Sequence, residues 1–385
     1  MRIRWWLAVV AMVLGLGLAA PARAAAGLTQ VTGFGSNPGA LRMYSYVPAG
    51  LPAGRPLVVA LHGCTQNAAG YYAGSGWGKY ADLYQAALVV PEQTSANNAL
   101  SCFNWFTAGD IGRGQGEALS IRQMVAYAVA TYGSDPARVY VTGLSAGGAM
   151  TAVMLAAYPD VFAAGAVIAG LPYNCGTICQ YQAVAKTPAQ WGDLVRAAYP
   201  GYSGPRPRVA IWHGTADSTV VPANATELRD QWTNVHGVSQ TPTASTTLPG
   251  GTVQESYGTA VQLNRVPGLG HGTPVNPGGA EDQCGTTGAY FLASICSSYY
   301  IARFWGLTGG SVPPTTPPTT PPTTTPPPAQ CVTASNYAHT TAGRAHQSGG
   351  YTYANGSNQA MGLWNVLVKT GLRRTGDNYY VLCGG

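Results

Sequence analysis

A serine flanked by glycines stands near the middle of the chain, in the pentapeptide Gly143-Leu144-Ser145-Ala146-Gly147. The strand-like run 138–142 precedes it, and a helical pattern over 147–157 follows it. Between a strand and a helix, G-x-S-x-G is the nucleophile elbow, a sharp turn that exposes the serine hydroxyl. Glycines are needed there because a side chain at position 143 or 147 would collide with neighbouring backbone. The pattern therefore predicts that Ser145 is a catalytic nucleophile.

A serine nucleophile needs a base, and after such an elbow the chain order is serine, acid, histidine. His271 comes late in the chain, in a Gly-rich loop that is flexible enough to bring its imidazole to Ser145. Asp217 lies in the turn after an apolar strand-like run and would accept a hydrogen bond from the ring N–H of His271. The alternative base is His213, which is expected instead to support the end of that strand. We predict a triad of Ser145, Asp217 and His271.

A tetrahedral intermediate on Ser145 needs hydrogen-bond donors for its oxyanion. One donor should be the amide of Ala146, which follows the nucleophile and starts a helix. The other is expected from His62-Gly63-Cys64, which follows an apolar run and stands where lipases carry an HGGG-type motif. We predict the backbone N–H of Cys64. The alternative, a purely structural half-cystine, is compatible with this role because a disulfide would help to fix the amide.

Three tryptophans are candidates for the wall of an acyl pocket: Trp77, Trp105 and Trp212. Trp105, within the segment FNWF, is the preferred one, and a packed core residue is the alternative for each. Arg113 and Glu117 lie four residues apart and are expected to form an ion pair without a catalytic role.

The elements that must position these residues alternate along the chain. Short apolar runs predict buried strands at 56–61, 87–90, 138–142, 163–169 and 208–212, and helical patterns cover 116–132 and 147–157. This alternation predicts an α/β fold with a mainly parallel sheet that helices cover on both faces. Because such a sheet places its site at the carboxyl ends of the strands, the candidate residues are expected to meet there.

Composition narrows the class of protein. Of the 385 residues only 9% are charged and 46% are hydrophobic, whereas charged residues usually make up roughly 25%. This excludes a charge-rich disordered chain and a long coiled coil. A nucleic-acid binder is not expected either, because it needs clustered cations.

Residues 1–24 have the pattern of a secretory signal peptide. Arg2 and Arg4 precede an apolar run over 5–20, and Ala22-Arg23-Ala24 supplies the small-x-small cleavage pattern. The alternative is a membrane anchor, but the run is shorter than the roughly 20 residues that a spanning helix needs. No later stretch is long and apolar enough to span a bilayer. We expect a secreted, extracellular protein.

Residues 311–328 separate two regions of the mature chain. Apart from its first two residues this segment contains only Pro and Thr, so it is expected to be a semi-rigid linker. It divides a body, residues 25–310, from a C-terminal segment, residues 329–385. The C-terminal segment is near the size at which a core alone is marginal, so a disulfide between its ends would stabilise it.

All eight cysteines lie after the leader, and an even number in an oxidising compartment indicates disulfides. Many pairings are open in principle, and the simplest is sequential: 64–102, 175–179, 284–296 and 331–383. Zinc is the rival interpretation, but no Cys-x2-Cys pair has a matching Cys or His pair. We expect no metal and no cofactor.

Seven segments of the body carry a resemblance to a known family: LHGCTQNAAGY, CFNWF, GRGQGEALSI, GLSAGGAM, HGTADSTV, GLGHGTPV and EDQCGTTGAYFLASICSSYYIARFWGL. Over about residues 28–307 the chain resembles the secreted polyhydroxybutyrate depolymerases and the related acetylxylan and feruloyl esterases. The resemblance implies an α/β-hydrolase fold in the type 1 arrangement, with the oxyanion segment before the nucleophile. It also implies Ser145, Asp217 and His271 as the triad and Cys64 as the oxyanion residue.

The segments CVTASNYAH, AGRAH and NGSN after the linker resemble the C-terminal substrate-binding domain of these depolymerases. The aromatic residues there are expected to divide between an adhesive face and a small core. They are Tyr337, Tyr351, Tyr353, Trp364, Tyr379 and Tyr380.

The resemblance implies a serine esterase that acts through an acyl-enzyme on an insoluble polyester, most of all poly(3-hydroxybutyrate). One alternative is a carbohydrate esterase that removes acetyl or feruloyl groups from xylan. A second is a non-enzymatic surface binder, against which the complete motifs argue. The expected partner is an insoluble polyester or polysaccharide surface, with no nucleic acid and, after signal cleavage, no membrane. We expect a monomer.

Overall fold

A computed structural model of the chain describes residues 27–308, 331–376 and 379–383. The predicted leader (1–24) and linker (311–328) lie outside these residues. The chain divides into two compact units, Met1–Thr308 and Gly309–Gly385, and each is described by itself.

A ten-stranded sheet forms the centre of the first unit, in the order β1-β2-β4-β3-β5-β6-β7-β10-β9-β8. The strands are β1 (Thr29–Val31), β2 (Arg42–Tyr46), β3 (Leu57–Leu61), β4 (Ala87–Glu92), β5 (Val139–Leu144), β6 (Ala164–Ile168), β7 (Arg208–Gly214), β8 (Ala244–Thr247), β9 (Val253–Tyr257) and β10 (Val261–Val266). From β4 to β10 the neighbouring strands run parallel, and the strands outside them pair antiparallel. The predicted, mainly parallel sheet is therefore confirmed.

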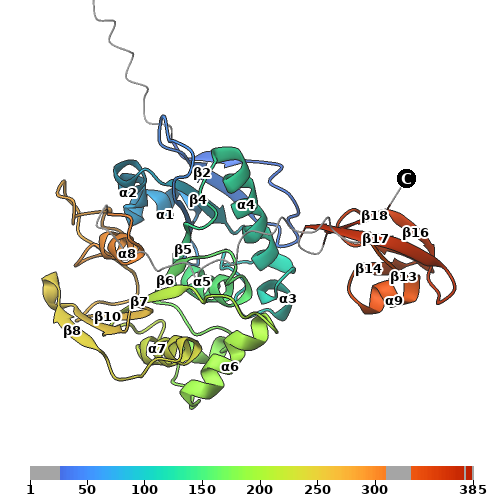
Figure 1. The fold of residues 1–385 in the computed structure, drawn as a ribbon. Coiled ribbons are helices and arrows are strands. Elements are labelled where there is room, and N and C mark those ends of the chain that lie inside the picture. Colours follow the sequence, from blue (N-terminus) through green and yellow to red (C-terminus); the bar gives the residue numbers. More distant parts are fainter. Residues whose placement is uncertain (1–26, 309–330, 377–378, 384–385) are drawn as a thin grey trace, which may run out of the picture. The chain divides into compact units, whose positions relative to one another are not determined.

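Helices cover both faces of this sheet (Figure 1). One hydrophobic cluster includes residues of α4 (Gly116–Tyr132), α5 (Ala146–Ala157), α6 (Pro188–Ala198) and α7 (Ala223–His236). A second cluster includes residues of α1 (Ala68–Ser75), α2 (Trp77–Tyr84) and α8 (Ser297–Trp305). The central strands β3, β5 and β6 are buried along their whole length, as expected for strands with helices on both sides.

The remaining elements of this unit are short. They are α3 (Ala108–Ile111), the 3-10 turns η1 (Thr177–Gln180) and η2 (Pro249–Gly251), and the strands β11 (Thr273–Val275) and β12 (Phe291–Ala293), which pair in parallel. No helix of the described residues is long and apolar enough to cross a membrane.

All seven predicted elements are present, and each of their ends lies within two residues of the prediction. The helix predicted at 116–132 has these bounds, because Gly133 adopts the left-handed conformation that ends helices. The strand predicted at 87–90 continues through Pro91 to Glu92. Beyond Val89 this strand pairs only with β2. From Val90 on, β4 has a partner strand on one side only. Proline has no N–H to donate, and it is tolerated at position 91 because the other side of the strand makes no ladder hydrogen bonds.

The second unit contains two small antiparallel sheets, β13-β17-β18 and β14-β15-β16, with α9 (Asn336–Thr341). The strands are β13 (Val332–Ser335), β14 (Ala345–Ser348), β15 (Tyr351–Ala354), β16 (Ala360–Leu363), β17 (Lys369–Gly376) and β18 (Tyr379–Leu382). Its buried hydrophobic cluster contains Ala345, Ala354, Met361 and Leu372. So small a core indicates a need for covalent support.

Four disulfides join the cysteines in sequential order: Cys64–Cys102, Cys175–Cys179, Cys284–Cys296 and Cys331–Cys383. The sequential pairing is therefore confirmed. The last disulfide connects the beginning of β13 to the end of β18, the two ends of the second unit.

Candidate active site

Ser145 occupies the turn between β5 and α5 with φ 57° and ψ −119°. A positive φ is unusual for a residue with a side chain and marks a strained position, as expected at a nucleophile elbow. A Cβ at Gly143 would lie 2.7 Å from the carbonyl oxygen of Leu61, and one at Gly147 would lie 2.5 Å from that of His62. Both glycines are therefore required, because β3 approaches the turn too closely for any side chain.

His271 and Asp217 are joined by a hydrogen bond. The Nδ1 atom of His271, in the loop between β10 and β11, lies 2.8 Å from Oδ2 of Asp217, in the turn after β7. The other carboxylate oxygen, Oδ1, accepts hydrogen bonds from the amides of Thr219 and Val220, each at 2.9 Å. Because a carboxylate only accepts, Nδ1 of His271 carries a proton, so in the neutral ring Nε2 is the nitrogen with the lone pair.

Asp217 is buried, with 3% of its surface exposed. Burial acts to raise the pKa of Asp217, but the hydrogen bonds from His213 and His271 outweigh it and hold this pKa well below its usual range. His213 lies at the end of β7, where Nε2 is 2.9 Å from the carbonyl oxygen of Val220 and 3.4 Å from Oδ2 of Asp217. His213 thus supports the end of β7, as predicted, and it also contacts the carboxylate of Asp217.

Ser145 and His271 line one pocket of about 210 Å³. Its other walls are formed by Gly63, Cys64, Thr65, Gln66, Leu100, Trp105, Leu144, Ala146, Leu171, Gln180, Thr219, Val220 and Tyr290. The pocket lies at the carboxyl ends of β3, β5 and β7, where a parallel sheet is expected to place a ligand. The structure thus brings five of the residues named from the sequence to one cavity, with Asp217 hydrogen-bonded to His271.

Cys64 and Ala146, the two predicted oxyanion residues, both line this pocket. Ala146 is the first residue of α5, where a backbone N–H has no partner within the helix. Within the described residues the amides on either side of Cys64 are engaged, Gly63 with Oε1 of Gln66 at 2.8 Å and Thr65 with the carbonyl of Leu100 at 2.7 Å. No such bond is found there for the Cys64 amide, so it is available to a ligand.

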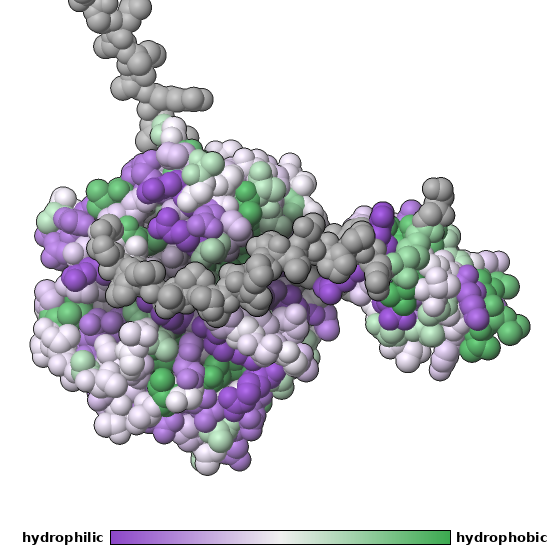
Figure 2. Space-filling view, in the orientation of Figure 1, coloured by the Kyte–Doolittle hydropathy of each residue, from purple (hydrophilic) through white to green (hydrophobic). Residues whose placement is uncertain are grey.

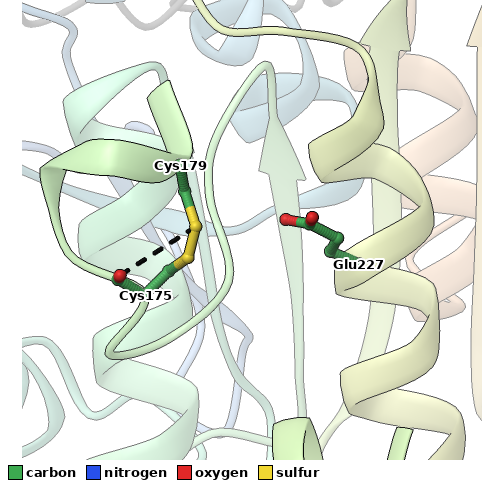
Figure 3. A group of neighbouring side chains, drawn as sticks. All are labelled: Cys175, Cys179 and Glu227. Carbon is green, nitrogen blue, oxygen red and sulfur yellow. Dashed lines mark hydrogen bonds between the residues drawn. A yellow bond between two sulfur atoms is a disulfide. The ribbon is translucent and has the colours of Figure 1, made fainter. Parts of the chain in front are cut away.

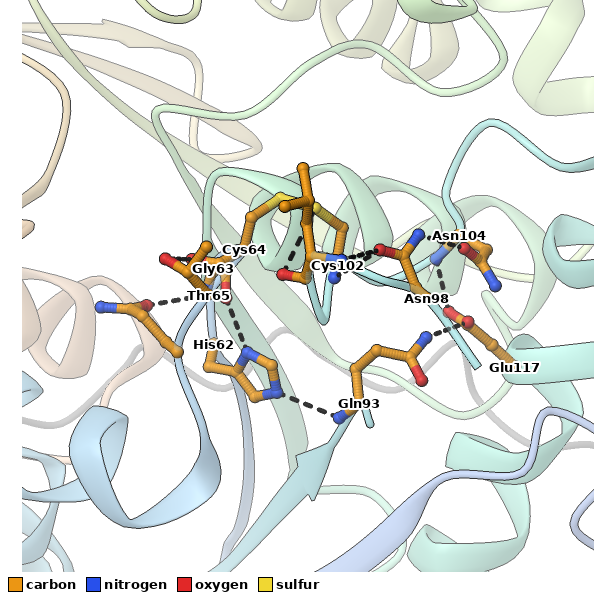
Figure 4. Close-up of a disulfide and its surroundings, with 11 residues drawn as sticks. His62, Gly63, Cys64, Thr65, Gln93, Asn98, Cys102, Asn104 and Glu117 are labelled. Atoms are coloured by element: carbon orange, nitrogen blue, oxygen red, sulfur yellow. Dashed lines mark hydrogen bonds between the residues drawn. A yellow bond between two sulfur atoms is a disulfide. The ribbon is translucent and has the colours of Figure 1, made fainter. Parts of the chain in front are cut away.

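The loop that carries Cys64 is fastened by its disulfide to Cys102 (Figure 4). The segment that contains Cys102 continues to Trp105, which forms part of the pocket wall. The disulfide therefore links the predicted oxyanion segment to a wall of the pocket.

The three candidate tryptophans have different surroundings. Trp105 is 7% exposed and lines the pocket. Trp77 is buried in α2 and stacks on Trp305, with ring centroids 5.2 Å apart. Trp212 is buried within β7. Neither Trp77 nor Trp212 borders the pocket. The structure places both in the core, which was the alternative for each, because their helix and strand turn these rings into the body.

Sequence reasoning gave no role to several pocket-lining residues, among them Leu100, Leu171, Gln180, Val220 and Tyr290. Leu171 and Val220 follow β6 and β7 by a few residues, so the rule that sites lie after strand ends could have found them. Tyr290 reaches the pocket because β12 pairs with β11, and its ring meets that of His271 edge-on at 6.2 Å. That long-range pairing has no local signal in the sequence.

The predicted ion pair between Arg113 and Glu117 was wrong. Arg113 pairs with Asp160, with its Nη1 atom 2.7 Å from Oδ1. Glu117 is fully buried and accepts hydrogen bonds from the Gln93 side chain and from the Asn104 amide. Burial raises the pKa of Glu117 to about 8, although these two hydrogen bonds act against the shift.

One group of side chains has the composition of a metal site. Cys175, Cys179 and Glu227 bring their possible ligand atoms within 4.8 Å of one another. Figure 3 shows that the two sulfur atoms are joined in the disulfide. Since metals bind cysteine as a free thiolate, the group offers a single carboxylate in this state.

The second unit exposes hydrophobic and aromatic side chains. Figure 2 shows hydrophobic residues along one edge of this unit. The large hydrophobic and aromatic residues that this unit exposes are Val332, Tyr337, Tyr351, Leu363, Trp364, Val366, Leu367 and Tyr379. Tyr337 and Trp364 lie together, with ring centroids 5.5 Å apart. Tyr380 packs against the small core instead, so the tail aromatics divide between surface and core as expected.

Comparisons with known proteins agree on one family. A family model described as esterase PHB depolymerase matches residues 41–255, more than half of the chain. Poly(3-hydroxyalkanoate) depolymerase C of Paucimonas lemoignei is 55% identical over 294 residues, covering 73% of this chain and 70% of that protein. Feruloyl esterase B of Talaromyces stipitatus is 38% identical over 294 residues, covering 72% of this chain and 81% of that protein.

Among solved structures, the acetyl xylan esterase of Aspergillus awamori superimposes with a TM-score of 0.64 at 29% identity. The match covers 73% of this chain and all of that protein. The family model, the match for which residue bounds are given above, lies entirely within the body.

Proposed function

The chain belongs to the esterase family of the polyhydroxybutyrate depolymerases, and from this premise we propose that it hydrolyses the ester bonds of an insoluble polyester, poly(3-hydroxybutyrate), outside the cell. One observation carries the proposal. Ser145, at a strained strand-to-helix turn, shares a pocket with His271, which is hydrogen-bonded to buried Asp217.

The proposed reaction follows from this geometry. Nε2 of His271 takes the proton of Ser145 as its hydroxyl oxygen attacks the ester carbonyl carbon. The amides of Cys64 and Ala146 stabilise the oxyanion, and ionised Asp217 stabilises the imidazolium. His271 then protonates the departing alcohol, and water hydrolyses the acyl-enzyme with the same histidine as base. These side chains and water are sufficient for both steps.

The size and lining of the pocket support a short acyl group. Its volume of about 210 Å³ is below the roughly 300–1,000 Å³ of pockets that hold drug-sized ligands. Leu100, Trp105, Leu171, Val220 and Tyr290 give it apolar walls. A single hydroxyacyl unit is the proposed occupant, and the rest of the polymer would lie outside the pocket. The 55% identity to a poly(3-hydroxyalkanoate) depolymerase favours this substrate over the xylan esters.

The chain is proposed to consist of a signal peptide (1–24), a catalytic domain (25–310), a linker (311–328) and a substrate-binding domain (329–385). The exposed side chains of Tyr337 and Trp364, which lie together, and of Leu367 support the last assignment, because exposed apolar patches mark interaction sites. Adsorption through this domain would raise the concentration of ester bonds near Ser145. Four disulfides support secretion, because disulfides persist in oxidising compartments.

A carbohydrate esterase acting on xylan is the second candidate, favoured by the structural match to an acetyl xylan esterase. The test is to incubate the secreted protein with poly(3-hydroxybutyrate) granules, acetylated xylan and methyl ferulate. Clearing of the granules with release of hydroxybutyrate units supports the proposal, whereas release of acetate or ferulate alone supports the second candidate. A Ser145→Ala variant that clears granules at the wild-type rate would contradict the proposed site.

A further inference from the structure

His62 is a fully buried histidine directly after β3, beside the segment that carries the Cys64 amide. Its Nδ1 atom lies 2.7 Å from the carbonyl oxygen of Gly63, and its Nε2 atom lies 3.0 Å from the backbone nitrogen of Gln93 (Figure 4). One face of the ring packs against Phe103, with centroids 4.9 Å apart. The imidazole thus has a polar partner at each nitrogen.

These contacts determine the tautomer of His62. The Gln93 amide can only donate, so Nε2 of His62 must accept and carries no proton. The proton therefore lies on Nδ1, which donates to the carbonyl oxygen of Gly63. Burial lowers the pKa of His62 from its ordinary value, which is consistent with a neutral ring.

The carbonyl of Gly63 and the amide of Cys64 belong to one peptide group. A trans peptide is planar, and its C=O and N–H point in opposite directions. The chain has no cis peptide bonds in its described part. Two groups donate to the Gly63 oxygen, Nδ1 of His62 at 2.7 Å and, less closely, the Gln66 amide at 3.3 Å. The groups that hold this oxygen also set the direction of the Cys64 N–H, and the shorter bond is that of His62. We propose that His62 is a positioning residue, which aims the Cys64 N–H into the pocket by holding the opposite end of its peptide.

A chain of buried groups holds His62 in turn. The Gln93 side chain donates to Glu117, and its Oε1 atom accepts from the Thr94 amide at 2.9 Å, which determines the orientation of the side-chain amide. Glu117 also accepts from the Asn104 amide at 2.8 Å, next to Trp105. The end of β4, the oxyanion segment and the pocket wall are thereby connected through side chains that do not reach the pocket.

This inference rests on the proposed role of the Cys64 amide. It predicts that His62 affects the rate of the reaction, whereas a histidine with a purely structural role affects stability alone. His236 provides the comparison. It is a half-buried histidine at the end of α7, with Nε2 2.9 Å from the carbonyl oxygen of Pro207, and it does not border the pocket. A histidine bonded to a backbone carbonyl far from the pocket should affect stability without affecting the chemistry.

Two substitutions separate the two hydrogen bonds of His62. In His62→Asn the side-chain N–H₂ occupies the place of Nδ1 and can still donate to Gly63, whereas the bond with Gln93 is lost. In His62→Gln the terminal amide lies near the place of Nε2, so its oxygen can accept from Gln93 and the bond to Gly63 is lost. The matched control is His236→Gln, and all variants are made in the full chain.

The variants are assayed with p-nitrophenyl butyrate and with a trifluoromethyl ketone, whose adduct with Ser145 places an oxyanion against the Cys64 and Ala146 amides. Loss of a donor at such a site costs roughly 100- to 1,000-fold in kcat, so a misdirected donor should cost about tenfold or more. His62→Gln should lower kcat and ketone affinity by this factor with KM within about twofold of wild type. His62→Asn should lose less than about threefold, and His236→Gln should change neither quantity.

Equal losses in His62→Gln and His62→Asn, or a wild-type kcat in His62→Gln, would overturn the proposal. Titration of competent active sites corrects each kcat for misfolded protein. If His62→Gln does not fold, the ¹³C chemical shifts of the wild-type histidine ring report the tautomer, and an Nε2–H form of His62 would overturn the proposal as well. Failure of the triad itself is separately visible, because Ser145→Ala would then remain active.

Discussion

The body and the C-terminal unit differ in how much apolar surface they bury. In the body, Asp217, His62 and Glu117 are buried and hydrogen-bonded within two large hydrophobic clusters. The C-terminal unit has a cluster of four buried hydrophobic residues, and many of its large apolar side chains are exposed to solvent. Catalysis needs atoms held in definite positions, which requires a large packed core. Adhesion to a flat polymer needs exposed area, which a small stapled domain can supply.

The largest expected effect is that of removing the Ser145 hydroxyl, which should abolish hydrolysis without affecting the binding of the protein to granules. Ser145→Ala should lower hydrolysis of both p-nitrophenyl butyrate and granules by roughly 10⁴-fold or more, because no other group supplies the nucleophile. Binding of the protein to granules, measured by depletion from solution, should stay at the wild-type level. A variant that loses granule binding along with activity would show that the body also carries the adhesion.

The second effect concerns the support of the small unit. Replacing Cys331 and Cys383 by serine should destabilise this unit by roughly 2–5 kcal/mol, which is comparable with the whole stability that so small a core supplies. Granule binding should then be lost, whereas kcat on the soluble ester should not change.

The matched control removes the Cys284–Cys296 disulfide of the body. This variant should lower the Tm of the body in calorimetry and leave granule binding intact. If both double variants affect adsorption alike, the two units are not separable in the way the structure indicates.

A third prediction tests the buried acid of the body. Glu117 has a folded pKa of about 8, against an unfolded value of about 4.3. Between these values the native state binds a proton that the unfolded state has released, so stability falls as pH rises. The slope is at most about 1.4 kcal/mol per pH unit. The free energy of unfolding of wild type minus that of Glu117→Gln should therefore fall between pH 5 and pH 8; a flat difference would contradict the raised pKa.

The smallest expected effect belongs to a single adhesive contact. Trp364→Ala removes a ring that is 41% exposed and lies beside Tyr337. Granule affinity should fall by roughly three- to tenfold, as a loss of about 1 kcal/mol implies. The activity on p-nitrophenyl butyrate should stay constant. Gln347→Ala, an exposed polar residue of β14 in the same unit, is the control, and it should leave the affinity unchanged.

Local patterns predicted much of this molecule. The apolar runs and helical spacings located the central strands and α4, because burial on both faces leaves a continuous apolar pattern. The two glycines around Ser145 predicted a strand-to-helix turn, and the structure has it, since only glycine fits beside β3. The four disulfides join cysteines that are consecutive in sequence. The assignment of Ser145, Asp217 and His271 as a triad stays a prediction that the observed hydrogen bond supports.

Only the tertiary structure decided which distant groups meet. The spacing of Arg113 and Glu117 pointed to a pair, yet Arg113 meets Asp160 and Glu117 meets Gln93. Trp77 and Trp105 are the same residue type, but Trp77 stacks on Trp305 in the core and Trp105 lines the pocket. This difference comes from the packing of the segments that carry them. Sequence spacing constrains the backbone over a few residues. The sheet order places β3 between β4 and β5, and so brings His62, Gln93 and the elbow together.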